Sequence, residues 1–193
     1  MSAEARREQV LDAAKAIVVD EGFHSVSIEA VARAAGITRP IVYAHFGDLQ
    51  GLLEALVERE SARALAQLAA VLPTDLGEGD PRKILLSAQR GYLGVVASDP
   101  DTWRLLLMPT EGAPALLRER ITAGRAQVVA QLARAVAAGL GRARSPDPEL
   151  TAHMLSATSD ADARLLLADP RQYPVERLLE HTRWILEQFR FGD

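Results

Sequence analysis

Residues 27–53 read SIEAVARAAGITRPIVYAHFGDLQGLL. Apolar positions recur at helical spacing on both sides of Gly36, a residue type that enters the positive-φ conformation of a tight turn without steric cost. Pro40 stands where the first turn of a helix needs no N–H donor. The stretch therefore predicts short helices at residues 28–35 and 39–46 joined by a glycine turn, which is a helix-turn-helix.

The helix predicted at residues 39–46 is too short to be stable alone, so its neighbours must hold it. Val42 and Phe46 are four residues apart and can anchor it through one apolar face. Groups suited to DNA contact are spread over the remaining surface and over the starts of the two helices. These candidate DNA-binding residues are Ser27, Thr38, Arg39, Pro40, Ile41, Tyr43 and His45.

Each candidate side chain has a distinct chemistry toward DNA. An arginine donates two parallel hydrogen bonds to O6 and N7 of guanine, so Arg39 is the candidate base reader. Thr38 can bond a phosphate or a base, and Ile41 can lie against a thymine methyl group. Tyr43 and His45 can donate to phosphate oxygens, which positions the helix without reading sequence. Taken singly, each could instead be an ordinary surface group, or for Tyr43 a core aromatic.

The rest of the chain also has apolar residues at helical spacing, without period-two runs of β-branched residues. Further helices are expected at residues 4–21, 49–72, 82–97, 100–107, 113–140, 148–168 and 175–190. We therefore expect an all-α fold of about nine helices and no sheet. Residues 1–48 are predicted to form an N-terminal three-helix domain with the helix-turn-helix, and residues 49–193 a larger helical bundle.

The chain of 193 residues has no cysteine, which excludes disulfides, thiolate metal sites and a cysteine nucleophile. The histidines and carboxylates lack convincing metal-ligand spacing, no catalytic triad can be nominated, and there is no glycine-rich phosphate loop. We expect no metal, no cofactor and no enzyme activity. No apolar run approaches the roughly 20 residues of a spanning helix, and the N-terminus is charged, so we expect a cytoplasmic protein without membrane contact.

The formal net charge of −4 argues against nucleic-acid binding only when charge is averaged over the whole chain. Residues 30–47 contain Arg33 and Arg39 and no acid. Residues 113–144 are the most basic segment, with six arginines against Glu119. We interpret that segment as a solvated face, with binding of an anionic partner as the alternative. Local charge at the helix-turn-helix thus permits DNA binding.

At the helix-turn-helix the chain resembles the TetR family of bacterial transcriptional regulators. Glycine, aromatic and apolar positions agree in order and spacing over roughly the first quarter of the chain. The matching positions are Ser27, Ala34-Ala35-Gly36-Ile37, Pro40, Tyr43, His45-Phe46-Gly47-Asp48 and Leu52-Leu53. The resemblance implies that the helix at residues 39–46 enters the major groove of double-stranded DNA.

The resemblance also implies a division of roles among the candidate residues. Those expected at base edges are Thr38, Arg39 and Ile41, and those expected at the backbone are Ser27, Tyr43 and His45. The chain departs from the family after Asp48, where Leu49 replaces a usual lysine that pairs with phosphate. Loss of one ionic contact predicts lower affinity for DNA and a salt dependence shallower by about one unit of log–log slope.

The family resemblance implies that the bundle encloses a pocket for a small effector. Large, adaptable side chains suit an apolar pocket, although at helical spacing they are also common core residues. The candidate effector-binding residues are Tyr92, Trp103, Met108, His153, Met154 and Ala157.

Two helical stripes near the C-terminus are candidates for a two-fold dimer interface, which the resemblance favours. The stripes consist of Ala161, Leu165 and Ala168, and of Leu178, Thr182, Ile185 and Phe189. Small residues in the first stripe permit close approach of a second helix. Both stripes could instead pack within the core of one monomer.

The resemblance thus implies a ligand-responsive transcriptional regulator that binds a palindromic operator as a homodimer and is released by a small-molecule effector. It favours repression over activation. Two alternatives stay open. One is a helical small-molecule-binding protein or enzyme that uses the bundle pocket, and the other is a helical partner-binding protein that does not contact DNA.

Overall fold

The computed structural model describes residues 2–74, 80–109 and 112–188, apart from the side chains of residues 140–144. The regular elements in these ranges are all helical, with no strand among them, which confirms the predicted all-α fold. In chain order they are α1 (Ala3–Glu21), the 3-10 helix η1 (Phe23–Ser25), α2 (Ile28–Ala34), α3 (Arg39–Phe46), α4 (Leu49–Ala69), α5 (Pro81–Ser98), α6 (Pro100–Leu107), α7 (Ala115–Arg144), α8 (Pro148–Ala168) and α9 (Val175–Gln188).

The observed helix bounds lie within a few residues of those expected from sequence. The helix expected to reach residue 72 ends at Ala69 and continues as a turn. The element η1 has no counterpart among the sequence predictions, because a single turn of three residues has no periodicity to detect. The helix predicted at residues 175–190 is described as far as Gln188.

Short polar side chains mark several helix starts. An oxygen of each accepts a backbone N–H of the first turn at 2.9 to 3.1 Å, which satisfies a donor that has no partner within the helix. These caps are Ser2, Ser27, Asp80 and Asp147. Thr38 has the extended N-cap conformation before α3, but its side chain makes no capping bond.

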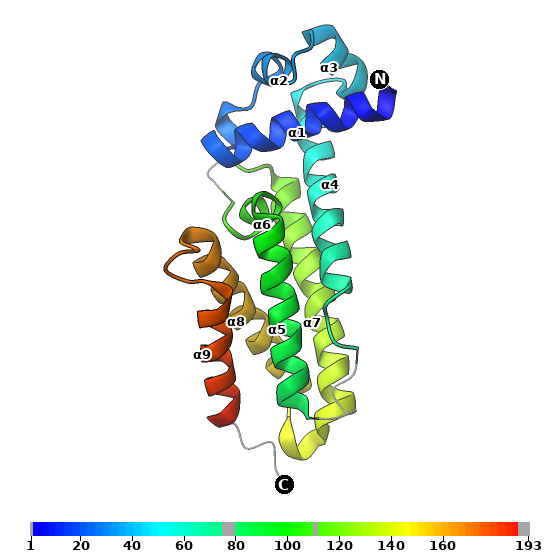
Figure 1. Cartoon of the computed structure of the whole chain (residues 1–193). Coiled ribbons are helices and arrows are strands. Elements are labelled where there is room, and N and C mark those ends of the chain that lie inside the picture. Colours follow the sequence, from blue (N-terminus) through cyan, green and yellow to red (C-terminus); the bar gives the residue numbers. More distant parts are fainter. Residues whose placement is uncertain (1, 75–79, 110–111, 189–193) are drawn as a thin grey trace. The chain divides into compact units, whose positions relative to one another are not determined.

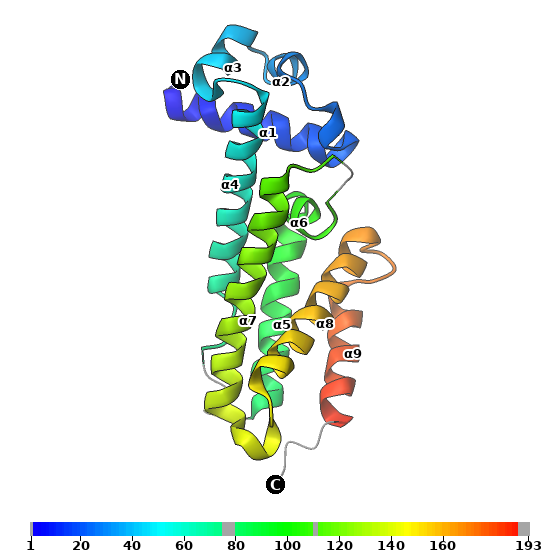
Figure 2. The same cartoon turned by 180° about the vertical axis from the view of Figure 1, so that it is seen from behind.

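The described residues divide into two compact units. The first comprises residues up to Ala64 together with Asp101–Thr122, and the second comprises Leu65–Pro100 together with residues from Ala123 onward. Within the first unit, α1 packs against η1 and α2, and α2 packs against α3 (Figure 1). Within the second unit, α5 packs against both α8 and α9 (Figure 2).

The core of the first unit extends beyond the three N-terminal helices. α3 contributes the fully buried Val42, and the same apolar cluster includes Leu105 of α6 and Leu117 of α7. Three short helices have too little apolar surface to enclose a core alone, so later segments complete it. The compact units therefore do not follow the predicted boundary between residues 1–48 and 49–193, and that functional division stays a prediction.

The second unit has its own buried residues, including Leu93 of α5, Leu166 of α8 and Leu179 of α9. In the ranges described, no helix is long and apolar enough to cross a membrane.

Leu117→Ala tests whether α7 completes the core of the first unit. Its side chain is fully buried, so we expect the free energy of unfolding to fall by about 2–5 kcal/mol. Trp103, which is 3% exposed in the same unit, supplies the fluorescence signal for chemical denaturation. Met108→Ala, at a residue that is 41% exposed, is the control and should change stability by about 0.5 kcal/mol or less. Equally small effects of both substitutions would contradict the extended core.

Candidate nucleic-acid interface

α3 is held in place by the two anchors that its spacing predicts. Val42 is fully buried, and Phe46 packs half-buried against the same core. The Arg7 guanidinium of α1 lies over the Phe46 ring, 5.3 Å from its centroid, in cation–π geometry. Gly47 ends the helix with a φ of 78°. The short helix is therefore stabilised by contacts from outside its own eight residues.

The turn between α2 and α3 is fixed by a positive φ and by one long-range hydrogen bond. Gly36 has a φ of 65°, which side-chain-bearing residues rarely adopt. Gln9 of α1 donates from Nε2 to the carbonyl oxygen of Ala35 at 2.8 Å. Sequence analysis missed Gln9, because its partner is 26 positions away and no local pattern links the two.

The sequence-predicted DNA-binding residues lie together on α3 and at the starts of α2 and α3. Thr38, Arg39, Pro40 and Tyr43 are exposed, and Ser27, Ile41 and His45 are half-buried. The Tyr43 side chain is 49% exposed, which excludes the core alternative for this residue. Their individual contacts with bases or phosphates stay predictions.

Arg39 has a partner that sequence analysis did not identify. Its Nη1 donates to Oε1 of Glu29 at 2.8 Å, which joins the first turns of α2 and α3. Both side chains are mostly exposed. The hydrogen bond from Arg39 lowers the pKa of the Glu29 carboxyl, so the carboxylate is ionised at neutral pH. Glu29 stands immediately before the acid-free stretch at residues 30–47, so the charge pattern alone did not indicate the pair.

The start of α4 is packed closely against the end of α3. Asp48 accepts the Gly51 backbone N–H through Oδ1 at 2.8 Å, and a Cβ atom at Gly51 would collide with the carbonyl oxygen of Phe46. Leu49, which stands at the position of the family lysine, is half-buried against the core of the first unit. The weaker DNA binding expected from this departure stays a prediction.

A buried carboxylate joins α1, α4 and α6 within the first unit. Glu60 of α4 is fully buried and lies 3.0 Å from Nζ of Lys15 on α1. It also accepts hydrogen bonds from Thr102 Oγ1 on α6 at 2.5 Å and from Arg59 Nε at 2.8 Å. These partners come from three helices, so the carboxylate ties α6 to the helices around the helix-turn-helix.

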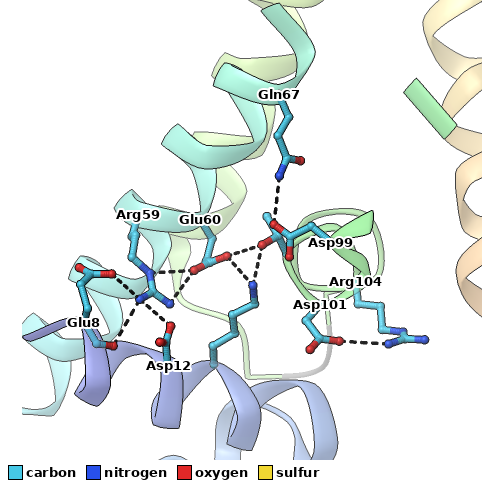
Figure 3. A network of polar contacts seen from close by, with 10 residues as sticks. Glu8, Asp12, Arg59, Glu60, Gln67, Asp99, Asp101 and Arg104 are labelled. Atoms are coloured by element: carbon cyan, nitrogen blue, oxygen red, sulfur yellow. Dashed lines mark hydrogen bonds and ion pairs between the residues drawn. The ribbon is translucent and has the colours of Figure 1, made fainter. Parts of the chain in front are cut away.

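Arg59 extends this network to two acids of α1. Its Nη1 lies 2.8 Å from Glu8 and 2.9 Å from Asp12, on the side opposite to Glu60 (Figure 3). Burial raises the pKa of Glu60, but hydrogen bonds from Thr102 and Lys15 and the two nearby cations outweigh it, so the pKa lies below its ordinary value. In the sequence, Glu60 sits in a charged run that looks like a solvated face.

The candidate effector-binding residues are divided between the two compact units. Tyr92 is buried in the second unit, whereas Trp103 is buried in the first. Met108 is exposed beyond the end of α6. The three candidates on α8, His153, Met154 and Ala157, are all exposed. An effector role for these residues stays a prediction.

The surroundings of Tyr92 are polar. Its hydroxyl donates to Oδ1 of Asp160 at 3.1 Å, and Arg125 of α7 bonds the other oxygen of this carboxylate at 2.5 Å. Burial, reinforced by the Asp160 charge, strongly raises the pKa of Tyr92. Gln89 donates to Asp162 at 2.8 Å, and burial raises the pKa of Asp162. The second unit thus contains a layer of hydrogen-bonded polar side chains, where sequence analysis expected apolar ones.

A separate shallow cleft of about 340 Å³ lies in the second unit, next to the turn after α4. It is lined by Val71, Pro73, Lys83, Ile84, Ser87 and Ala88. None of the candidate effector-binding residues belongs to this lining.

The two candidate dimer stripes differ in exposure. Ala161, Leu165 and Ala168 of α8 are exposed. On α9, Leu178 is buried, Thr182 and Ile185 are half-buried, and Phe189 lies outside the described residues. The Thr182 hydroxyl is also engaged, since it donates to the Leu178 carbonyl oxygen at 2.9 Å. A dimer role for both stripes stays a prediction.

Sequence analysis missed two exposed groups on α9. Trp184 is 56% exposed, and the His181 ring stacks on it with 5.6 Å between centroids. The spacing of three residues between them is the signal that could have identified this face. Throughout the described ranges, no group of three or more histidine, aspartate or glutamate side chains could hold a metal ion.

Comparisons with known proteins agree with the helix-turn-helix geometry. A family model described as "Bacterial regulatory proteins, tetR family" matches residues 10–56. FasR of Mycolicibacterium smegmatis, named an HTH-type transcriptional activator, is 29% identical over 101 residues, which are 52% of this chain and 45% of FasR. The chain spans about half the length of the curated relatives it matches.

Solved structures match over the whole length. A TetR-like transcriptional regulator from Rhodococcus sp. RHA1 has a TM-score of 0.77 at 25% identity, with 100% of both chains covered. SmeT of Stenotrophomonas maltophilia, in its complex with triclosan, has a TM-score of 0.71 at 25% identity, covering 94% of this chain and 91% of SmeT. The fold is that of a helix-turn-helix regulator. Together with the family model and the relatives, it indicates a TetR-family transcriptional regulator, and such regulators are not enzymes.

Glu60→Gln tests the buried network, because it keeps the side-chain size and removes the charge that Lys15 and Arg59 face. We expect the free energy of unfolding at neutral pH to fall by about 3–5 kcal/mol. Since the Glu60 pKa is lower in the folded chain than in the unfolded one, its stabilisation is present at neutral pH. That stabilisation is lost as the pH falls below about 4.3 and through the folded-state pKa.

Urea denaturation at neutral and acidic pH measures both effects, and the variant should lose less stability on acidification than the unmodified chain. Glu58→Gln is the matched control on the same helix, because Glu58 is exposed and pairs with the exposed Arg120. The control should change stability by about 1 kcal/mol or less. Equal losses for the two variants would contradict the assigned role of Glu60.

Proposed function

We propose that the chain binds a palindromic operator in double-stranded DNA, with α3 in the major groove. The observation that carries this proposal is a short helix that is anchored by buried residues on one side and exposes Thr38, Arg39 and Tyr43 on the other. Arg39 is assigned to a guanine, and Tyr43 to a phosphate. Because one eight-residue helix reads only a few bases, two copies must act together on two half-sites about 34–36 Å apart.

The second copy is proposed to bind through α8 and α9. Four large apolar side chains that are exposed in the described ranges lie on these helices, namely Leu150, Met154, Leu165 and Trp184. Exposed apolar side chains that gather on neighbouring elements mark an interaction surface. A two-fold axis through this surface gives each dimer two copies of α3, as a palindromic operator requires. The exposed Ala161 and Ala168 belong to the same surface, and we exclude the buried Leu178 from it.

A small-molecule effector is proposed to bind in the second unit and to lower the affinity for the operator. SmeT, which is named a repressor, has been solved with triclosan, whereas FasR is named an activator. We assign repression to this chain on its likeness to SmeT over nearly the whole length. Of the candidate effector-binding residues, we retain Tyr92, because it is buried in the second unit beside Asp160 and Gln89.

The proposed switch uses the segments by which the chain passes from one unit to the other. These crossings fall within α4 after Ala64, after Pro100, the first residue of α6, and within α7 after Thr122. In the first unit, α6 is bonded through Thr102 to Glu60, which also contacts α1. A shift of α4 or α6 on effector binding would therefore reach the helices that carry α3 and change the separation of the two reading helices.

A mobility-shift titration with the DNA flanking the gene tests the function, with a random duplex of equal length as reference. We expect tighter binding to the flanking DNA. Arg39→Ala should weaken operator binding by about 1–3 kcal/mol and leave random-DNA binding nearly unchanged. An equal loss on both duplexes would assign Arg39 to a phosphate instead. No retardation of any duplex would favour a helical effector-binding or partner-binding protein.

Leu165→Arg tests the proposed dimer surface, because it places a charge on an exposed part of α8 that the second copy would cover. We expect sedimentation velocity to show a shift from dimer to monomer, together with loss of tight operator binding. Ala126→Arg, at an exposed position of α7, is the control and should remain dimeric. An unchanged dimer in the Leu165 variant would contradict this interface.

A further inference from the structure

Glu29 and Arg39 form an ion pair on the solvent side of the helix-turn-helix. Glu29 is in the first turn of α2, and Arg39 is the first residue of α3. Arg39 Nη1 lies 2.8 Å from Glu29 Oε1, with the side chains 61% and 58% exposed. The pair is thus accessible to any DNA that binds α3.

Glu29 is the one acid in the sequence between Glu21 and Asp48, a stretch whose two basic residues are Arg33 and Arg39. A bare carboxylate at this surface would repel phosphates. A carboxylate paired with Arg39 has its charge neutralised, and it neutralises Arg39 in return. The free protein therefore carries less positive charge on its proposed reading surface than its arginines suggest.

The geometry of the pair leaves part of Arg39 available for base recognition. A guanidinium has five N–H donors in a planar fork, and the contact with Glu29 uses one donor on Nη1. The Nε and Nη2 donors remain on another edge of the plane, and two parallel donors are what the O6 and N7 atoms of guanine accept. Glu29 can therefore orient the fork without occupying the base-reading edge.

We propose that Glu29 is a positioning residue that makes Arg39 favour operator over random DNA. The inference rests on the proposed function, in which Arg39 reads a guanine. On random DNA, Arg39 stays paired with Glu29 and adds little to the phosphate attraction that drives sequence-independent binding. On the operator, guanine bonds the second edge while Glu29 holds the first. The carboxylate thereby lowers random-DNA affinity more than operator affinity.

Glu29→Gln tests this, with affinities measured on operator and on random duplex over a series of salt concentrations. We expect random-DNA affinity to rise by about two- to fivefold, the range of an exposed ion pair. The log–log salt slope on random DNA should steepen by about 0.9, the value for one additional phosphate contact. Operator affinity should stay within about twofold, so the ratio of operator to random affinity falls. Glu21→Gln makes the same charge change at an exposed position on α1 and should leave that ratio unchanged.

The same substitution in an Arg39→Ala background separates positioning from simple charge repulsion. In that background the bare Glu29 carboxylate repels the phosphates of both duplexes, so Glu29→Gln raises both affinities alike. If Glu29 acts through Arg39, the fall in the ratio of operator to random affinity occurs only while Arg39 is present. A fall in that ratio that persists without Arg39, or an equal rise on both duplexes when Arg39 is present, would overturn the inference and leave the proposed function intact. An Arg39→Ala variant that binds the operator as tightly as the unmodified chain would overturn the reading role itself.

Glu29→Asp is a control for an effect on folding, because an acid in the first turn also stabilises α2. This variant keeps the charge and should retain the salt slope of the unmodified chain on random DNA. A slope as steep as that of Glu29→Gln would count against the ion pair as the cause. Circular dichroism melting of all variants, with midpoints compared to the unmodified chain, identifies any variant whose affinity reflects lost structure.

Discussion

Burial of Val42 and Phe46 is the constraint on which the first unit depends, because the eight residues of α3 cannot remain helical in water alone. The surface that buries them comes from α1, α2 and α4, and is completed by Leu105 and Leu117. Each of these elements therefore helps to set the direction of α3. The same packing leaves the opposite face of α3 to solvent, so one arrangement both stabilises the helix and exposes its polar groups. One face of α3 thus stabilises the helix, and the opposite face carries the groups proposed for recognition.

A buried charge gives the first unit a second constraint. Glu60 would lower stability if it were unpaired, so the chain must place Lys15, Arg59 and Thr102 around it at the same time. An apolar core tolerates small rearrangements, whereas a carboxylate with several fixed donors permits few. The network therefore makes the relation between α1, α4 and α6 specific. In the proposed regulator, this specificity allows a displacement of α6 to move the helices that carry α3.

Charged and apolar side chains are unevenly distributed over the helices. The net charge of −4 does not describe the helix-turn-helix, where the one acid, Glu29, is paired with Arg39. With Arg39 so engaged, the surface attracts random DNA weakly, and in the proposed regulator tight binding comes from correct base contacts and from the second copy. Apolar groups are concentrated elsewhere. Exposed side chains such as Met154 and Trp184 lie on α8 and α9, where the second copy is proposed to bind.

Local sequence signals were sufficient to predict the helices, the helix-turn-helix and its exposed residues, because caps, turns and periodicity act over a few residues. The sequence by itself therefore determined the all-α class, the bounds of α3 and the likeness to the TetR family at the helix-turn-helix. It could not determine which segments complete the core, why Glu60 is buried, or that Arg39 is bound to Glu29. Those features depend on contacts between residues far apart in the chain, which only the tertiary structure decides, because packing of distant helices, and not local propensity, sets which side chains meet.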